Sequence, residues 1–179
     1  NPSEFIGLEG ITHLCAGGET PMFKSHLDTV DRFFRDKLLG EEGRGKFEAV
    51  SYRCKEKVAD LFQVKADDIA FLSSTSEGIN LLVHALDWEP GDNIVVSDVE
   101  FPSDVLPWTR LKDRGVELRI VRNKDWKTEL DALSEAMDDR TRLVALSHVS
   151  YFTGQRLPLK ELSDMVHSHG ALLSLDVTH

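Results

Sequence analysis

The sequence is poor in cysteine and proline, and it contains no long apolar run. Its two cysteines, Cys15 and Cys54, stand far apart, which offers neither a disulfide framework nor a paired zinc-ligand spacing. Six prolines and 8% aromatic residues in a chain of 179 residues exclude collagen-like and disordered classes. No apolar stretch approaches the roughly 20 residues that a membrane helix needs. These absences predict a soluble chain with a hydrophobic core and no membrane partner.

Acidic residues outnumber basic ones. There are 31 Asp and Glu against 21 Lys and Arg, which gives a net charge of -10. Such a surface repels the phosphates of nucleic acid on average, so we expect no nucleic-acid partner and small ligands instead. The N-terminus lacks the basic and apolar regions of a signal peptide. Together with the sparse cysteines, this predicts a cytoplasmic location.

Two helical stretches precede a regular alternation of short apolar runs with amphipathic ones. We expect helices over 21–39 and 47–62, with a flexible polar loop over 40–46 between them. Several of the apolar runs are continuous, as in parallel strands that are covered on both faces. The pattern predicts an α/β fold, with a mostly parallel sheet and helices on both faces. Strands are expected at 69–72, 93–97, 116–121, 142–147 and 171–175, and helices at 77–86, 104–114, 129–137 and 159–169.

The first predicted strand is followed by a run of hydroxyl side chains that leads into a helix. The run is Ser73-Ser74-Thr75-Ser76, and Glu77 comes next. Ligands of open α/β sheets gather beyond the carboxyl ends of the strands, and a helix N-terminus with added hydroxyls suits a phosphate. The same pattern is also a capping box, which taken alone is the commoner explanation.

Aromatic and carboxylate side chains follow two further strands. Phe101 could stack on a planar ring, or it could be a hydrophobic staple before a helix capped by Ser103 or Asp104. Tyr151, in the loop after the fourth strand, has simple packing as its alternative. Both positions lie where a ligand of the sheet would be bound.

The fifth strand ends in Asp176, and His179 comes three residues later. A carboxylate at the end of an apolar strand is costly unless it is paired, and a protonated heteroaromatic nitrogen would be a suitable partner. An ordinary buried Asp satisfied by backbone amides is the alternative. No glycine-rich dinucleotide fingerprint or Walker loop is present, which disfavours nucleotide binding.

Together these junctions resemble the fold type I pyridoxal-phosphate enzymes of the class V aminotransferase group, which includes cysteine desulfurases, selenocysteine lyases, isopenicillin N epimerases and kynureninases. The run from Thr75 to Asn80 looks like the group's Thr-Thr-Glu-Gly-Ile-Asn phosphate turn. Phe101 stands where the group has the residue that stacks on the cofactor ring, within a Phe-Pro-Ser-Asp sequence similar to that of kynureninases. The resemblance runs from about Ala16 to the end of the chain.

The resemblance implies roles for particular residues. Asp176 matches the carboxylate that pairs with the pyridine nitrogen, and His179 matches the residue near the phenolic oxygen of the cofactor. Tyr151 occupies the place of an Asn that usually faces the cofactor, which makes it a candidate for substrate contact. The expected cofactor is pyridoxal 5'-phosphate, and the expected cofactor-binding residues are Thr75, Ser76, Phe101, Asp104, Asp176 and His179.

The lysine that forms the Schiff base in this group follows the Asp-x-x-His segment, and no lysine of this sequence occupies that position. The sequence therefore resembles the N-terminal part of a longer enzyme: an arm and first helix over 1–45, and a cofactor-binding large domain over 46–179 that is incomplete at its C-terminus. We expect the fragment alone to be inactive and the intact polypeptide to be a homodimeric enzyme of amino-acid metabolism, with a small-molecule amino-acid substrate.

Three functions are compatible with these motifs. The first is a desulfurase-like lyase or transferase that depends on pyridoxal phosphate. A kynureninase-like hydrolase or an epimerase is the alternative enzyme. A non-catalytic cofactor-binding or interaction module is expected if the natural chain ends at His179.

Overall fold

A computed structural model describes residues 2–179, and the chain divides into two compact units. Unit 1 contains the residues up to Phe71, and unit 2 contains Leu72–His179. All of the site residues expected from the sequence lie in unit 2. The domain boundary expected after residue 45 remains a prediction. Among residues 2–179, no helix is both long enough and apolar enough to cross a membrane.

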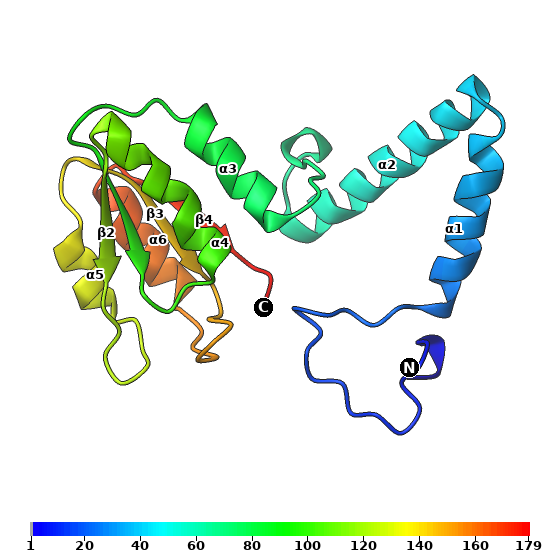
Figure 1. Cartoon of the computed structure of the whole chain (residues 1–179), viewed down its shortest axis with the longest axis horizontal. Helices are drawn as coiled ribbons and strands as arrows, with labels where there is room; N and C mark the ends of the chain where they lie inside the picture. The colour runs from blue at the N-terminus through cyan, green and yellow to red at the C-terminus, as the bar shows by residue number, and fades with distance from the viewer. Residues whose placement is uncertain (1) are drawn as a thin grey trace. The chain divides into compact units, whose positions relative to one another are not determined.

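Unit 1 is dominated by two successive helices (Figure 1). The first is shorter than the predicted 21–39, and the second begins at Glu41, so the flexible loop predicted over 40–46 is wrong. Only Gly40, which precedes the second helix with φ 61°, keeps a turn conformation there. The elements of unit 1 are η1 (Pro2–Glu4), α1 (Lys24–Lys37), α2 (Glu41–Phe62) and η2 (Ala66–Asp68).

The close approach of α1 and α2 explains why a glycine-rich segment is helical. A Cβ atom at Gly43 would lie 2.0 Å from the backbone oxygen of Asp36, so glycine is required at that point. Lys46 then joins the two helices, with its Nζ 3.1 Å from Asp36 Oδ1 and 3.3 Å from Glu42 Oε1. The hydrogen bonds that Lys46 donates to both carboxylates raise its pKa. These contacts come from tertiary packing, which the local composition does not reveal.

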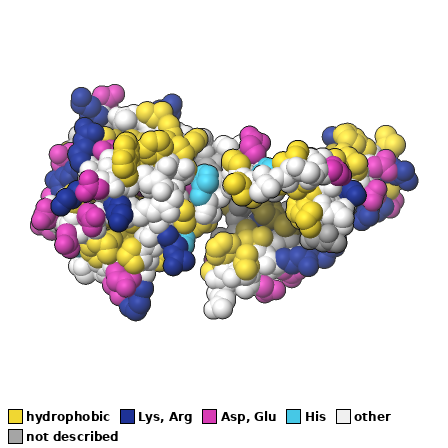
Figure 2. All heavy atoms as spheres, turned by 90° about the horizontal axis from the view of Figure 1, so that it is seen from below, with side chains coloured by type: hydrophobic (Ala, Val, Ile, Leu, Met, Phe, Trp, Pro, Cys, Tyr) yellow, Lys and Arg dark blue, Asp and Glu magenta, His cyan; other side chains and the backbone are white. Residues whose placement is uncertain are grey.

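Unit 1 buries little of its apolar surface. Within α1 no residue is buried, and within α2 only Gly43 and Ala59 are. The space-filling view shows hydrophobic side chains gathered over the part that holds α1 and α2 (Figure 2). The exposed apolar residues of these two helices are Leu27, Val30, Phe33, Phe34, Val50, Tyr52, Leu61 and Phe62.

The strand predicted over 69–72 is also wrong. These residues have no regular secondary structure, and Phe71 and Leu72 are 50% and 46% exposed. An apolar run becomes a strand only when a neighbouring strand supplies hydrogen bonds, and no strand pairs with 69–72 among the described residues.

Unit 2 alternates strands with helices, as predicted. The ends of its strands differ from the expected ones by at most one residue. Its elements are α3 (Thr75–Ala85), β1 (Asn93–Ser97), α4 (Pro102–Val105), η3 (Leu106–Arg114), β2 (Glu117–Val121), α5 (Leu130–Ala136), β3 (Thr141–Ser147), α6 (Leu159–Ser168) and β4 (Leu172–Asp176).

The strands of unit 2 form one parallel sheet with the order β2-β1-β3-β4. Ser97 pairs with Val121, and Ser147 pairs with Asp176, so these strand ends lie at one edge. This edge is the carboxyl edge of the sheet. The loops after β1, β3 and β4 all start there.

Helices cover both faces of the sheet, which confirms the predicted fold class. Ile94 and Val96 of β1 pack with α3 and η3 on one face. Val95 and Val144 pack with α5 and α6 on the other face. This alternation is the two-residue period of a strand, and the continuous apolar sequences arise because both faces are buried.

The helix predicted over 104–114 is divided into two. The α4 helix ends at Val105, and 3-10 structure continues from Leu106 to Arg114. Pro107 has no backbone N–H to donate and its ring blocks a regular α-helical turn, so the tighter helix starts next to it. Trp108 and Leu111 of η3 are nevertheless buried in the core, as an amphipathic pattern predicts.

Candidate cofactor site

At the N-terminus of α3, one hydroxyl of the serine and threonine run caps the helix and two others do not. Ser74 is the N-cap, and its Oγ accepts a hydrogen bond from Glu77 N at 3.2 Å. Glu77 Oε2 accepts hydrogen bonds from the N and Oγ of Ser73, both at 2.7 Å, which lower the pKa of Glu77. The capping interpretation therefore holds for Ser74. Thr75 and Ser76 lie in the first turn, exposed, and their hydroxyls have no hydrogen-bond partner among residues 2–179.

An open hollow of about 400 Å³ lies beside this helix start. Ser76 and Phe101, both predicted for the site, line it together. Arg110 of η3 also lines it, is exposed, and forms no ion pair within the described part of the chain. A free guanidinium beside a helix N-terminus favours an anion there. Sequence reasoning missed Arg110, because only the packing of η3 against α3 brings it close to Ser76.

Phe101 is a ring at the carboxyl edge that is 46% exposed. It precedes Pro102, the first residue of α4, so Ser103 and Asp104 lie inside that helix and are not its cap. The ring of Phe101 meets that of Tyr151 edge to face, with centroids 5.0 Å apart. The ring of Tyr151 lies 6.5 Å from that of His179. The structure thus brings together three predicted residues from three different loops.

Three carboxylates gather beside these rings. Asp104 is 3% exposed, and its Oδ2 is buried without a hydrogen-bond partner in the described chain. Burial, then the charges of Asp176 and Glu100, raise the pKa of Asp104 to about 7. Asp104 and Asp176 are both acceptors when ionised, so a hydrogen bond between them requires one proton. Sequence reasoning found two of these carboxylates and missed Glu100.

Glu100 connects this cluster to β3. Its Oε2 accepts hydrogen bonds from Ser147 N at 2.8 Å and from Ser147 Oγ at 2.5 Å. Burial, together with the charge of Asp176, raises the pKa of Glu100 more than these hydrogen bonds lower it. Glu100 therefore fixes the segment that carries Phe101 and Asp104 against the carboxyl edge of the sheet.

Asp176 itself is only partly satisfied by the backbone. Its Oδ1 accepts a hydrogen bond from Thr178 N at 2.6 Å. For this one oxygen, the alternative of an Asp satisfied by backbone amides holds. No Lys, Arg or His within residues 2–179 forms an ion pair with Asp176, Asp104 or Glu100. Partly buried carboxylates that lie close together without a cation are costly. Their arrangement favours a ligand that brings a positive charge or a proton.

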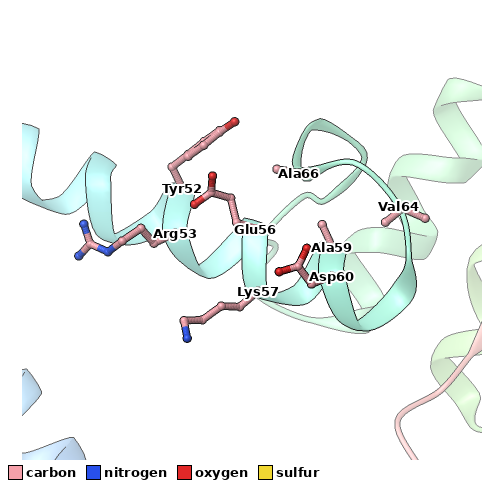
Figure 3. Close-up of a pocket in the computed structure, with 8 residues that line it drawn as sticks. All are labelled: Tyr52, Arg53, Glu56, Lys57, Ala59, Asp60, Val64 and Ala66. Carbon is pink, nitrogen blue, oxygen red and sulfur yellow. The ribbon is translucent and has the colours of Figure 1, made fainter.

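Other places in the described chain are weaker candidates. Residues 2–179 contain no group of three or more metal-ligating side chains that could hold an ion. A hollow of about 490 Å³ lies on unit 1, and Tyr52, Glu56 and Lys57 are among its lining residues. In Figure 3, Tyr52 and Glu56 lie on one side of α2, and Lys57 points away on the other. None of the predicted site residues lines this hollow.

Comparisons with known proteins agree with this architecture. A family model described as aminotransferase class-V matches residues 40–179. A probable cysteine desulfurase of Methanothermobacter thermautotrophicus is 32% identical over 176 residues, which cover 94% of this chain and 44% of that protein. A cysteine desulfurase of Escherichia coli is 37% identical over 118 residues, which cover 62% of this chain and 29% of that protein.

Solved structures show the same fold. A mutant of C-DES with glycine covalently linked to its PLP cofactor superposes with a TM-score of 0.92 at 21% identity, over all of this chain and 50% of that one. The apo cysteine desulfurase of Thermococcus onnurineus gives a TM-score of 0.82 at 24% identity, over 98% of this chain and 46% of that one. This chain spans about half the length of these proteins or less. The family match covers most of its residues, and the chain belongs to the class-V aminotransferase family.

Proposed function

We propose that the intact protein is a pyridoxal-phosphate enzyme that acts on an amino acid, with desulfurase- or lyase-like chemistry. The observation that carries this proposal is the carboxylate cluster Glu100, Asp104 and Asp176, which lies at the carboxyl edge of the sheet without a cation from the described chain. The family relatives named cysteine desulfurase, and the PLP cofactor in the C-DES structure, support it.

The residues present fit the proposed cofactor. Its phosphate matches the first turn of α3, where the hydroxyls of Thr75 and Ser76 are unbonded and Arg110 adds a positive charge. Its planar ring matches the exposed face of Phe101. Asp176 would hold a proton on the ring nitrogen, and His179 would face the ring from the opposite loop. When bound, pyridoxal phosphate supplies an electron sink for the carbanion at the amino acid's alpha carbon.

The chain's own residues would tune this site in two ways. The buried Asp104, whose pKa is raised to about 7, carries a proton at mildly acidic pH and can then donate a hydrogen bond to Asp176, which stays ionised. This removes one negative charge from the cluster and leaves Asp176 to face the ring nitrogen. Glu100, bonded to Ser147, keeps Phe101 in position.

Binding of a cofactor analogue tests the site without requiring catalysis. Pyridoxine 5'-phosphate has no aldehyde and cannot react with surface lysines. We expect Asp176→Asn to weaken its binding at least tenfold, which corresponds to about 1.4 kcal/mol. The control is Asp98→Asn at the end of β1, where Asp98 is already bonded to Asn123 N at 2.8 Å. Equal affinity of both variants and the wild type, measured by isothermal titration calorimetry, would overturn the site.

The reaction itself is tested on the intact polypeptide. We propose that it releases sulfur from cysteine or a related amino acid, and that residues 1–179 alone bind the cofactor without turnover. Kynureninase-like hydrolysis is the second candidate, and it is favoured by the Phe101–Tyr151 aromatic pair beside the buried Asp104. Product analysis with cysteine and kynurenine as competing substrates distinguishes the two. No product from either, with cofactor bound, would favour a non-catalytic module.

We further propose a cytoplasmic homodimer. The exposed apolar faces of α1 and α2 support self-association, because such faces are usually covered. Two unpaired, exposed cysteines, Cys15 and Cys54, fit a reducing compartment. Sedimentation of the intact polypeptide over a range of concentrations tests the dimer, and fractionation of cells tests the location.

A further inference from the structure

Three exposed aromatic side chains extend the candidate site along the carboxyl edge. Trp126, Tyr151 and Phe152 are 63%, 42% and 59% exposed, and together they are called the aromatic strip. The ring of Trp126 lies 5.4 Å from that of Phe152, and Phe152 lies 6.0 Å from Tyr151. Tyr151 in turn contacts Phe101, which lines the hollow with Ser76. A continuous series of rings therefore leads away from the proposed cofactor site.

The strip stands on two loops at the same edge of the sheet. Figure 1 shows the hairpin after β2 and the loop after β3 at the ends to which the strand arrows point. The side-chain amide of Gln155 joins them: its Oε1 accepts from Thr128 N at 2.7 Å, and its Nε2 donates to Thr128 O at 2.9 Å. The two loops thus form one rigid support.

The hairpin holds Trp126 in a conformation that is unfavourable for its residue type. Lys124 and Lys127 close the turn with backbone hydrogen bonds of 2.8 and 2.9 Å. Asp125 and Trp126 between them both have positive φ, 49° and 64°. Left-handed backbone costs a bulky residue about 1 kcal/mol or more, so such strain persists chiefly where it serves a function. Asn123 Oδ1 accepts from Trp126 N at 3.0 Å and secures the turn.

Folding alone does not account for this arrangement. Strained backbone presents a large ring to water beside two other exposed rings, although burial of such rings would stabilise the protein. The exposed surface area of three rings is far smaller than the roughly 800 Å² of surface that each partner buries in a standard protein interface. Their size and their continuity with Phe101 suit the side chain of a small molecule bound next to the cofactor.

We propose that the aromatic strip binds the side chain of the substrate, and that the substrate is an amino acid with an aromatic or extended apolar side chain, such as an S-substituted cysteine. This inference rests on the proposed cofactor site, since it specifies the substrate class of that same site. Apolar contact with Tyr151 and Phe152 selects the side chain, and Trp126 accommodates its far end.

Reduced adducts of the cofactor with amino acids test this without a catalytic lysine. The probes are N-(5'-phosphopyridoxyl)-L-phenylalanine and N-(5'-phosphopyridoxyl)-L-alanine, and pyridoxine 5'-phosphate is the reference. We expect the phenylalanine adduct to bind the chain at least tenfold more tightly than the alanine adduct in calorimetric titrations. Phe152→Ala removes most of this preference and leaves the affinity for pyridoxine 5'-phosphate unchanged. Phe71→Ala, at a ring of unit 1 that is 50% exposed, changes neither.

A second variant guards against loss of the hairpin. Trp126→Asn removes the ring and places a residue that tolerates left-handed backbone, so the hairpin is kept while the preference falls. Equal binding of the two adducts, with pyridoxine 5'-phosphate still bound, would overturn the aromatic strip and leave the cofactor site intact. A preference that survives Phe152→Ala would also overturn it, as would a dimer that Phe152→Ala dissociates without changing the preference. Failure of pyridoxine 5'-phosphate to bind would instead overturn the proposed function.

Discussion

Unit 1 and unit 2 use apolar residues in opposite ways. In unit 2, β1 is buried along its whole length, and two layers of helices cover the sheet. In unit 1, α1 has no buried residue, although Phe33, Phe34 and Leu27 give it an apolar face. A hydrophobic face thus stabilises a structure only where another element covers it. The same comparison explains why the candidate site lies in unit 2, whose rigid strands hold polar side chains at fixed positions.

The largest expected effect is the loss of a core leucine from unit 2. Leu162 of α6 is 0% exposed, so Leu162→Ala should lower the free energy of unfolding by about 2–5 kcal/mol. Leu38, which follows α1, is 88% exposed, so Leu38→Ala should change the free energy of unfolding by no more than about 0.5 kcal/mol. Urea unfolding followed by far-ultraviolet circular dichroism measures both units, because each of them contains helices. Equal effects of the two variants would contradict the comparison.

A smaller effect should come from the proton on Asp104. Its pKa in the folded protein is raised to about 7 from 3.8, so the folded state binds more protons than the unfolded state between these values. Stability from this group is therefore fully present below about pH 4 and lost as the pH rises to about 7. Asp104→Asn removes this titration. Between pH 5 and pH 8 the free energy of unfolding of the variant, measured in urea titrations, should therefore rise by about 2 kcal/mol relative to that of the wild type.

Asp98 has a pKa that is shifted in the opposite direction, and the same urea titrations can measure its effect on stability. Burial raises its pKa, but hydrogen bonds from Asn123 and Arg122, together with the charge of Arg122, lower it by more, so the net pKa lies below the usual value. Its stabilisation is present above the ordinary pKa and lost on acidification. Asp98→Asn should therefore show no relative gain between pH 5 and pH 8. A gain equal to that of Asp104→Asn would show that the effect does not arise from the carboxylate cluster.

The smallest effect compares two glycines of α2. A Cβ atom at Gly43 would meet the Asp36 backbone oxygen at 2.0 Å, whereas one at Gly45 would meet nothing within 4 Å. Gly43→Ala should destabilise the turn between α1 and α2 by about 1–2 kcal/mol. Gly45→Ala should stabilise the helix by about 0.5–1 kcal/mol. Amide hydrogen exchange around Lys46 measures both, and a gain in protection from Gly43→Ala would be the contrary outcome.

The sequence predicted those features that depend on local pattern. The strands β1 and β3 were predictable because both of their faces are buried, which makes them continuously apolar. The early start of α2 was not, because it depends on the contact between Gly43 and Asp36. Nor was the unpaired state of 69–72, because hydrogen-bond pairing between strands is non-local.

The candidate site follows the same division. Phe101, Tyr151 and His179 were predicted singly from their positions after strands, and the structure shows that their rings are neighbours. The roles of these residues toward a cofactor remain predictions. Arg110 and Glu100 were not predicted as site residues, because the place of Arg110 beside Ser76 and the bond of Glu100 to Ser147 depend on non-local packing.

The role proposed for the carboxylate cluster is to keep the ring nitrogen of a bound cofactor protonated. The most direct measurement is the absorbance spectrum of pyridoxine 5'-phosphate bound to the protein, recorded as the pH is raised. The protein should hold the ring nitrogen protonated to a higher pH than in free solution, and Asp176→Asn should abolish the difference. A bound ligand whose ring nitrogen titrates as it does in the free ligand would contradict this role of the cluster.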